Sequence, residues 1–561
     1  MPQPKNKPMR SLLFWTSAGI VIILAWSLTQ HSASIVLDLI PPAGEPERPS
    51  IFEAIQQQLH VAAETLLDYE NLPPMPTSTE GLKLAPGAAD ALFGSGDAKN
   101  NEWKIVREVV KAINAGRLSD WRVAEKNVGK IQASSCIDTV LSSLTTSDIT
   151  SSVRKVFWEM ARGSRNYEAV KWGIGIASVG LQPNEVADLL ILARHAEFTL
   201  YASHALLRES EAHPEFKKHL VALLPISYGW GVVKVIEYIV RDKSLIGHRG
   251  VQRDVLIHGM HNCESIPMEI AFTIAKAINL RSFCLEAGRD GQLYRALTSL
   301  MDTLVNEPDP LGGLAQLDQW PPIYDAYVTM IGERPVDARL LVALSSLEHF
   351  LDDKKLNWPR RLTELDKVRR MFDERLSPAV LRRDLGSEEG RWAALQIIRE
   401  KSVRDLLPDV EAAFNKKPDF ETVQILGELG GRQQLEVMLK RIPSLVDLEA
   451  RRSVPFSMVN VFGPEYKDDF LYAQIIEALG RLATPPALER IKAAASDLNP
   501  QVRSAACNAI AQLPLTSLDD ELRAAVKARL NDSPQYVADA ARKAAKHVGT
   551  PVPPASPKKS D

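Results

Sequence analysis

The stretch of sequence best suited to metal or acid–base chemistry runs from His258 to Glu264. His258, His261 and Cys263 are residue types that bind zinc, and Glu264 follows directly. The two histidines are three residues apart and would share one face of a helix. The alternative is that Asn262 and a nearby proline end the helix here, which leaves the histidines with structural roles. Because no second half of a zinc pattern occurs elsewhere, we expect no metal site and retain His258, His261 and Cys263 only as weak candidates.

The remaining sequence offers no recognisable catalytic pattern. His195 and His204 are nine residues apart around Glu197, and solvated or helix-capping roles account for them. There is no Gly-x-Ser-x-Gly, Walker, dinucleotide-binding or haem-attachment motif. We therefore expect a protein that is not an enzyme, with no cofactor and no catalytic residue, and we do not expect a small-molecule substrate.

Basic residues are concentrated between positions 360 and 383, where acidic residues interleave with them. Two interpretations are open: a helix surface covered with salt bridges, or a surface on which an acidic partner docks. The net charge of the whole chain is -3, which argues against nucleic acid as a partner. The basic members of this group are Arg360, Arg361, Lys367, Arg369, Arg370, Arg382 and Arg383.

The N-terminus carries a pattern typical of membrane proteins. Residues 1–10 are polar with three basic residues, and residues 11–28 contain no charged residue. This arrangement predicts a transmembrane signal-anchor at 11–28 with residues 1–10 in the cytoplasm and the bulk of the chain on the other side. A cleaved signal peptide, cut near Ser32–Ser34, is one alternative and would give an exported soluble protein. A buried core helix is the other. A poor glycosylation site at Asn531 favours a bacterial inner-membrane protein that faces the periplasm.

The chain of 561 residues is too long for one compact core, so we expect several domains or an elongated array. Residues 29–101 are predicted to be a linker with one helix at 51–69. From 102 to 375, apolar residues recur at helical spacing between short breaks, and no alternating strand pattern is evident. Examples of predicted helices are 102–115, 168–179, 185–196, 213–224, 232–241 and 268–278. The tail at 550–561 is rich in Pro, Ser and Lys and is predicted to be disordered.

An internal repeat organises the C-terminal part of the chain. The ten residues from Asp497 to Ala506 are echoed about 35 residues later, from Asp532 to Ala541. Each copy predicts an antiparallel pair of helices, in which the aspartate caps the second helix. Nine apolar residues at three-and-four spacing are predicted to form the buried repeat core: Val502, Ala505, Ala506, Ala509, Ile510, Val537, Ala540, Ala541 and Ala544.

This pattern resembles the HEAT repeat of the armadillo-like superhelical class, most clearly at 484–549. Arg503 stands where the HEAT pattern has its typical arginine, and the second copy has Ala538 there. A fainter copy begins at Gly390-Arg391, where Arg391 aligns with Arg503, and Leu426-Gly427 matches Leu479-Gly480. The resemblance implies HEAT-like repeats over 376–549, with an insertion near 447–468, and divergent repeats over 102–375. A separate helical bundle is the alternative for the latter region.

The expected fold is therefore an all-α, helical-hairpin solenoid behind one transmembrane helix. The resemblance implies a non-catalytic scaffold or adaptor that binds a protein partner, because such repeats mostly bind proteins. Two alternatives are a solenoid-based enzyme of the bilin-lyase or DNA-glycosylase type and a permanent structural subunit of an envelope complex.

Overall fold

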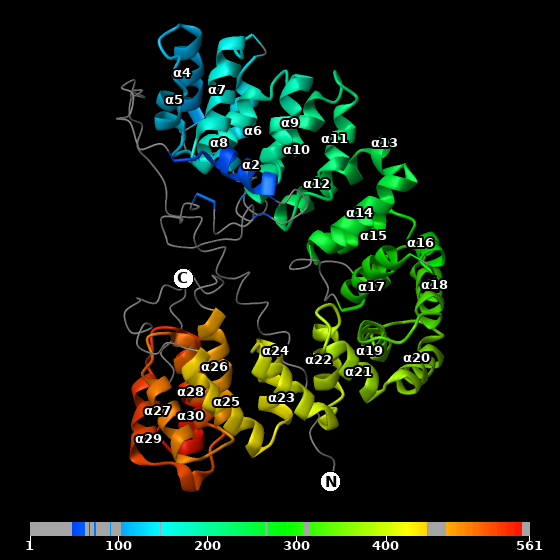
Figure 1. Ribbon diagram of the computed structural model, residues 1–561, viewed down its shortest axis with the longest axis vertical. Coiled ribbons are helices and arrows are strands. Elements are labelled where there is room, and N and C mark those ends of the chain that lie inside the picture. The colour runs from blue at the N-terminus through cyan, green and yellow to red at the C-terminus, as the bar shows by residue number, and fades with distance from the viewer. Residues whose placement is uncertain are drawn as a thin grey trace. The chain divides into compact units, whose positions relative to one another are not determined.

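The computed structural model describes residues 48–61, 67, 72–73, 90, 103–145, 147–263, 268–288, 290–306, 313–445 and 467–551. All regular secondary structure in these ranges is helical, and no strand occurs in them, which confirms the all-α fold (Figure 1). The chain divides into two compact units. Among the described residues, the first unit contains those up to 251 and the second those from 252 onward.

The helices of the first unit form two layers. In one layer α4, α6, α8, α10 and α12 pack side by side in that order, and in the other α5 packs on α7 while α2 contacts both α7 and α9. The sequential pairs α4/α5, α7/α8, α9/α10 and α11/α12 also pack on each other. The helices are α2 (Ile51–Val61), α4 (Trp103–Asn114), α5 (Trp121–Val128), α6 (Ala133–Ser143), α7 (Ser151–Gly163), α8 (Tyr167–Ala177), η4 (Pro183–Glu185), α9 (Val186–Leu192), α10 (Ala196–Glu209), α11 (Phe216–Ala222), α12 (Trp230–Arg241) and α13 (Lys243–Ile246).

Local sequence explains where these helices begin. Asp120, Thr150 and Asn166 each accept a hydrogen bond from a backbone N–H of the first turn of α5, α7 and α8. The helix predicted at 185–196 is the one that differs clearly from the structure. It ends at Leu192, and His195 caps the separate helix α10 through its ring nitrogen.

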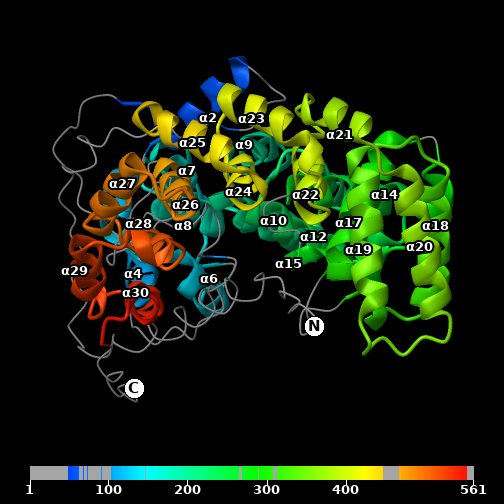
Figure 2. The ribbon, with the colours of Figure 1, turned by 90° about the horizontal axis from the view of Figure 1, so that it is seen from below.

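The second unit repeats the same layering. One layer contains α15, α17, α19, α22, α24, α26, α28 and α30, each packed on the next, and the other contains the contacting pairs α16/α18, α21/α23 and α27/α29. Figure 2 shows the C-terminal part of the first of these layers, from α24 to α30. Its elements are α14 (Arg249–Asn262), α15 (Met268–Ala277), α16 (Leu280–Glu286), α17 (Gly291–Asn306), η5 (Leu314–Gln316), α18 (Trp320–Gly332), α19 (Ala338–Asp352), α20 (Arg361–Arg375), α21 (Pro378–Leu385), α22 (Arg391–Glu400), η6 (Arg404–Leu406), α23 (Leu407–Lys416), α24 (Phe420–Leu429), α25 (Arg432–Leu445), α26 (Lys467–Leu479), α27 (Pro485–Ala495), α28 (Pro500–Ile510), η10 (Leu515–Ser517), α29 (Asp520–Arg529) and α30 (Gln535–Val548).

The predicted repeat core lies on α28 and α30, and all nine of its residues are buried. Six of the nine are alanines, whose small side chains allow the eleven-residue helix α28 to pack closely on both α26 and α30. Two glycines sit at similarly close approaches. A Cβ added to Gly427 would lie 2.9 Å from the Ala478 side chain, and one added to Gly480 would lie 2.4 Å from the Ala509 carbonyl oxygen.

The expected capping role of the repeated aspartates is wrong in detail. Asn499 caps α28 by accepting from the Gln501 N–H, and Asp497 instead accepts from the N–H of Asn499. Helix α30 follows Pro534, which offers no side-chain cap. Asp532 pairs instead with Arg503 and Arg529, because its carboxylate lies between two successive helical pairs.

Several predictions concern residues outside the described ranges. They include the cytoplasmic segment 1–10, the transmembrane segment 11–28, most of the linker 29–101, nearly all of the insertion near 447–468, and the tail beyond residue 551. Within the described ranges, helices are too short or too polar to cross a membrane. The linker helix predicted at 51–69 is described as a helix over Ile51–Val61.

Candidate functional site

A groove on the second unit brings together four arginines from separate segments. It has a volume of about 420 Å³. Arg295 comes from α17, Arg334 from the loop after α18, Arg339 from the first turn of α19, and Arg383 from α21. We call this feature the arginine groove.

Backbone carbonyl groups hold three of these arginines in place. Nη2 of Arg334 donates to the carbonyl oxygens of Ala287 and Asp290 at 2.8 and 3.2 Å, and its guanidinium lies 4.3 Å from the centre of the Tyr294 ring. Arg339 donates to the carbonyl oxygen of Glu389 at 2.8 Å. A carbonyl is a neutral acceptor, so it orients a guanidinium without cancelling its positive charge.

Arg383 and Arg295 have carboxylate partners. Arg383 donates to the Val336 carbonyl at 3.1 Å and to the Asp384 carboxylate at 2.7 Å. Arg295 forms an ion pair of 3.2 Å with Glu389, whose side chain is 74% exposed. Because that glutamate is so exposed, this second pair is readily exchanged with solvent or with another carboxylate.

The other two carboxylates of the groove, Asp337 before α19 and Asp384 of α21, both bind the start of α19. Asp337 accepts from the Leu340 N–H at 2.8 Å, and Asp384 accepts from the Ala338 N–H at 2.6 Å. Both therefore bind N–H groups that the first helical turn leaves without a partner. The negative charges of Asp337 and Asp384 therefore stabilise the N-terminus of α19, and Asp384 also pairs with Arg383.

Three helices of one layer also begin at the groove. Gly291 starts α17, Asp337 precedes α19 and Gly390 precedes α22, and all three residues line the groove. Helix N-termini carry partial positive charge. The N–H groups at the start of α17 and α19 already bind the carboxylates of Asp290, Asp337 and Asp384, so it is the guanidinium groups that make the groove suited to binding an anion.

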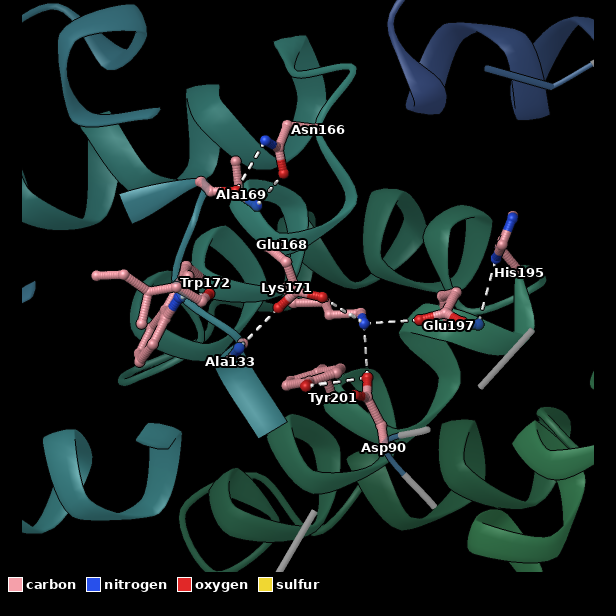
Figure 3. Close-up of polar contacts among 12 residues, drawn as sticks. Asp90, Ala133, Asn166, Glu168, Ala169, Lys171, Trp172, His195, Glu197 and Tyr201 are labelled. Carbon is pink, nitrogen blue, oxygen red and sulfur yellow. Dashed lines mark hydrogen bonds and ion pairs between the residues drawn. The ribbon is translucent and has the colours of Figure 1, made fainter. Parts of the chain in front are cut away.

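The first unit contains a different cluster, centred on the buried amine of Lys171. Its Nζ lies 2.8 Å from Asp90, 2.9 Å from Glu168 and 2.6 Å from Glu197, as Figure 3 shows. Glu168 shares α8 with the lysine, Glu197 comes from the first turn of α10, and the Tyr201 hydroxyl of α10 donates to Asp90 at 3.1 Å. We call this the Lys171 cluster.

The electrostatics of this cluster follow from burial and mutual charge. Burial by itself would lower the pKa of Lys171, but the negative charges of Glu168, Glu197 and Asp90 outweigh it and raise that pKa. Burial raises the pKa of Glu168, although Lys171 opposes the shift. Lys171 therefore stays protonated.

His195 lies near the same cluster but has a different protonation state. Burial, with a further contribution from the charge of Lys171, lowers the pKa of His195 to about 3. Its ring packs 5.2 Å from Tyr167 and 5.0 Å from Phe198, measured between ring centres. His195 is therefore neutral at physiological pH, where Nδ1 accepts from the Glu197 N–H at 3.2 Å.

The contacts of the Lys171 cluster join separate parts of the first unit. Glu168 also accepts from the N–H of Ala133, at the start of α6, at 2.7 Å. The cluster thus connects α6, α8, α10 and the segment that carries Asp90 (Figure 3). These contacts are direct ionic and hydrogen-bonded links between the elements, in the interior of the unit.

The weak metal candidates are in different environments. His261 is exposed at the end of α14, His258 is half-buried, and Cys263 is fully buried. Burial lowers the pKa of His258 and raises the pKa of Cys263 to about 12. No group of three or more metal-binding side chains occurs within the described ranges.

The basic residues between 360 and 383 mostly pair with nearby acids. Arg360 bonds to Asp325 at 3.0 Å, and Arg369 bonds to Glu348 at 3.0 Å. Arg383 differs from these residues because it also lines the arginine groove. These pairs are those of a helix surface covered with salt bridges, the first of the two interpretations of this sequence region.

Sequence reasoning did not single out Lys171 or the other three groove arginines. A lysine within the mostly apolar helix α8 was a usable signal for Lys171, because such a residue must find partners when the helix is buried. Arg295, Arg334 and Arg339 gave no comparable signal, since they belong to three separate segments.

Comparisons with known proteins add little to this description. No protein-family model matches the sequence, and no curated protein matches it. Among solved structures, the crystal structure of an engineered protein is similar, with 14% sequence identity and a TM-score of 0.28. That match covers 80% of this chain and 100% of the engineered one.

Proposed function

We propose that this protein is a membrane-tethered scaffold of the HEAT-like solenoid type, which binds a protein partner along its helical pairs. The observation that carries the proposal is the arginine groove, which three successive helices of one layer build at their N-terminal ends. Stacked helical pairs present such surfaces without disturbing their core. In this proposal the groove is where the partner binds.

A shared ion pair supports the HEAT-like assignment. Arg503 bonds to Asp532, 29 residues later, and Arg391 bonds to Asp419, 28 residues later. Arg391 is the residue that aligns with Arg503 in the fainter copy. The same arginine position therefore connects one helical pair to the next in both copies, as expected of a true repeat.

The membrane tether rests on the sequence of residues 11–28. Their lack of charge and the basic residues before them favour an uncleaved anchor, with the rest of the chain outside the cytoplasm. A bacterial inner-membrane protein facing the periplasm is the location that we propose.

Site-specific photocrosslinking in native membranes tests the proposed function. A photoreactive phenylalanine replaces Val336, which lines the groove, and in a control chain it replaces Arg432, which is exposed on α25. We expect a discrete adduct from position 336 and a much weaker one from position 432. Mass spectrometry of the adduct identifies both the partner protein and the residue at which the chain begins.

Two results would count against this proposal. If position 336 gives no adduct and the protein purifies alone, the scaffold function is wrong. If the chain begins near Ile35, the tether is wrong, and the protein is exported in soluble form.

A further inference from the structure

We infer that the arginine groove binds an acidic peptide segment, and that the exposed Glu389 side chain occupies the position of one partner carboxylate. This inference rests on the proposed function, because it names the chemistry of the partner at that same site. Its residues are Arg295, Arg334, Arg339 and Arg383, with Glu389 at the edge.

The first argument is the balance of charge. Two of the three groove carboxylates, Asp337 and Asp384, bind the N–H groups at the start of α19. The carbonyl groups that hold Arg334 and Arg339 leave their positive charges in place. Four arginines against three carboxylates leave the groove with one positive charge, and displacement of the Glu389 side chain leaves it with a second, so an anionic partner is complementary to it.

The second argument is the contact between Arg295 and Glu389. An exposed pair of this kind contributes little to stability, so another carboxylate can displace it at low cost. Arg339 binds the backbone carbonyl of Glu389 and not its side chain. The backbone thus stays in position when the glutamate side chain leaves, and Arg295 becomes available to the partner.

The third argument favours a peptide over a small anion. Trp392 is 54% exposed on the first turn of α22, two residues beyond Gly390 of the groove. Tryptophan and arginine are the residues most enriched where protein partners bind strongly. A peptide with acidic and apolar side chains could contact both, whereas phosphate would use the arginines alone.

Fluorescence anisotropy with the full-length protein tests this inference. The probe is a labelled ten-residue peptide of alternating Glu and Leu, and the matched probe has Gln in place of each Glu. The protein variants are the double substitution Arg295→Gln with Arg339→Gln, the single substitution Glu389→Gln, and the control Arg432→Gln. Arg432 is an exposed arginine that pairs with Glu436 of its own helix, α25. Circular dichroism verifies that each variant is folded.

We expect the wild-type protein to bind the Glu peptide at least tenfold more tightly than the Gln peptide, because charge-assisted bonds to arginine are strong. The double variant should lose about tenfold in affinity, and Glu389→Gln should bind more tightly than wild type since its competitor is removed. Arg432→Gln should bind as wild type does. Raising the salt concentration should weaken binding of the Glu peptide.

Equal binding of the two peptides, or an unchanged affinity in the folded double variant, would overturn the inference. Inorganic phosphate is a further competitor. If it binds more tightly than the Glu peptide and displaces it, the groove is a phosphate site and the inference is wrong. These failures differ from failure of the proposed function, because a partner could still crosslink at position 336 in the double variant.

Discussion

Arg503 and Asp532 form a two-point ion pair that joins two consecutive helical pairs. Nε of Arg503 donates to one carboxylate oxygen of Asp532 at 2.9 Å, and Nη2 donates to the other at 2.7 Å. The aspartate side chain is only 4% exposed, and that of the arginine is 13% exposed. A fixed fork of this kind sets both the distance and the angle between its two partners.

Breaking this pair should loosen the C-terminal helices. Asp532→Asn is expected to cost about 2 kcal/mol, because Arg503 then keeps a largely buried charge without a charged partner. Hydrogen exchange of α28 and α30, read by mass spectrometry in the full-length protein, measures the effect. Asp539→Asn is the control, since Asp539 is 61% exposed in its pair with Arg542. Equal protection in the two variants would contradict the role given to Asp532.

Gly480 should not tolerate even a methyl group. A Cβ at this position would lie 2.4 Å from the Ala509 carbonyl oxygen and 2.6 Å from its Cα, so α28 would have to move. Gly480→Ala is expected to destabilise the protein by about 1–3 kcal/mol. Thermal unfolding with limited proteolysis measures this change. The control is Gly431→Ala, whose Cβ would meet nothing nearer than 3.8 Å and should shift stability by less than about 0.5 kcal/mol.

Removing the central amine of the Lys171 cluster should be severe. Lys171→Met leaves three carboxylates around an apolar side chain, and such a loss costs about 3–5 kcal/mol. Lys155→Met is the control, because Lys155 is 76% exposed on α7. Urea unfolding followed by circular dichroism compares the two variants.

A companion variant separates charge from packing in the Lys171 cluster. Lys171→Met combined with Glu168→Gln and Glu197→Gln should recover part of the lost stability, because fewer buried carboxylates then lack a partner. If this variant is no more stable than Lys171→Met alone, the loss came from packing.

His195 should make stability depend on pH. The pKa of His195 is about 3 in the folded chain and 6.5 in the unfolded chain. Between these two pH values the unfolded chain therefore binds a proton that the folded chain does not. Stability should therefore fall as the pH falls from about 6.5 towards 3, by up to about 1.4 kcal/mol per pH unit from this group. His195→Asn keeps a capping side chain and should remove this component. Urea midpoints measured across the pH range test it, and parallel curves for the two proteins would refute it.

Local patterns in the sequence determined much of the fold. Apolar residues at helical spacing are a property of short segments, so helices such as α4 and α12 could be predicted to within two residues. The break before α10 was missed because a histidine is an uncommon helix cap. The buried positions on α28 and α30 were also predictable, since they follow from the same spacing.

Only the tertiary structure decided which distant residues meet. Tyr201 and Asp90 are 111 residues apart, and Arg295 and Glu389 are 94 residues apart, yet each pair is in direct contact. Such contacts depend on how helices stack, and no local preference of either residue encodes that arrangement. The physical reason is that spacing within one helix determines which face is buried, while the neighbouring helices determine what that face meets.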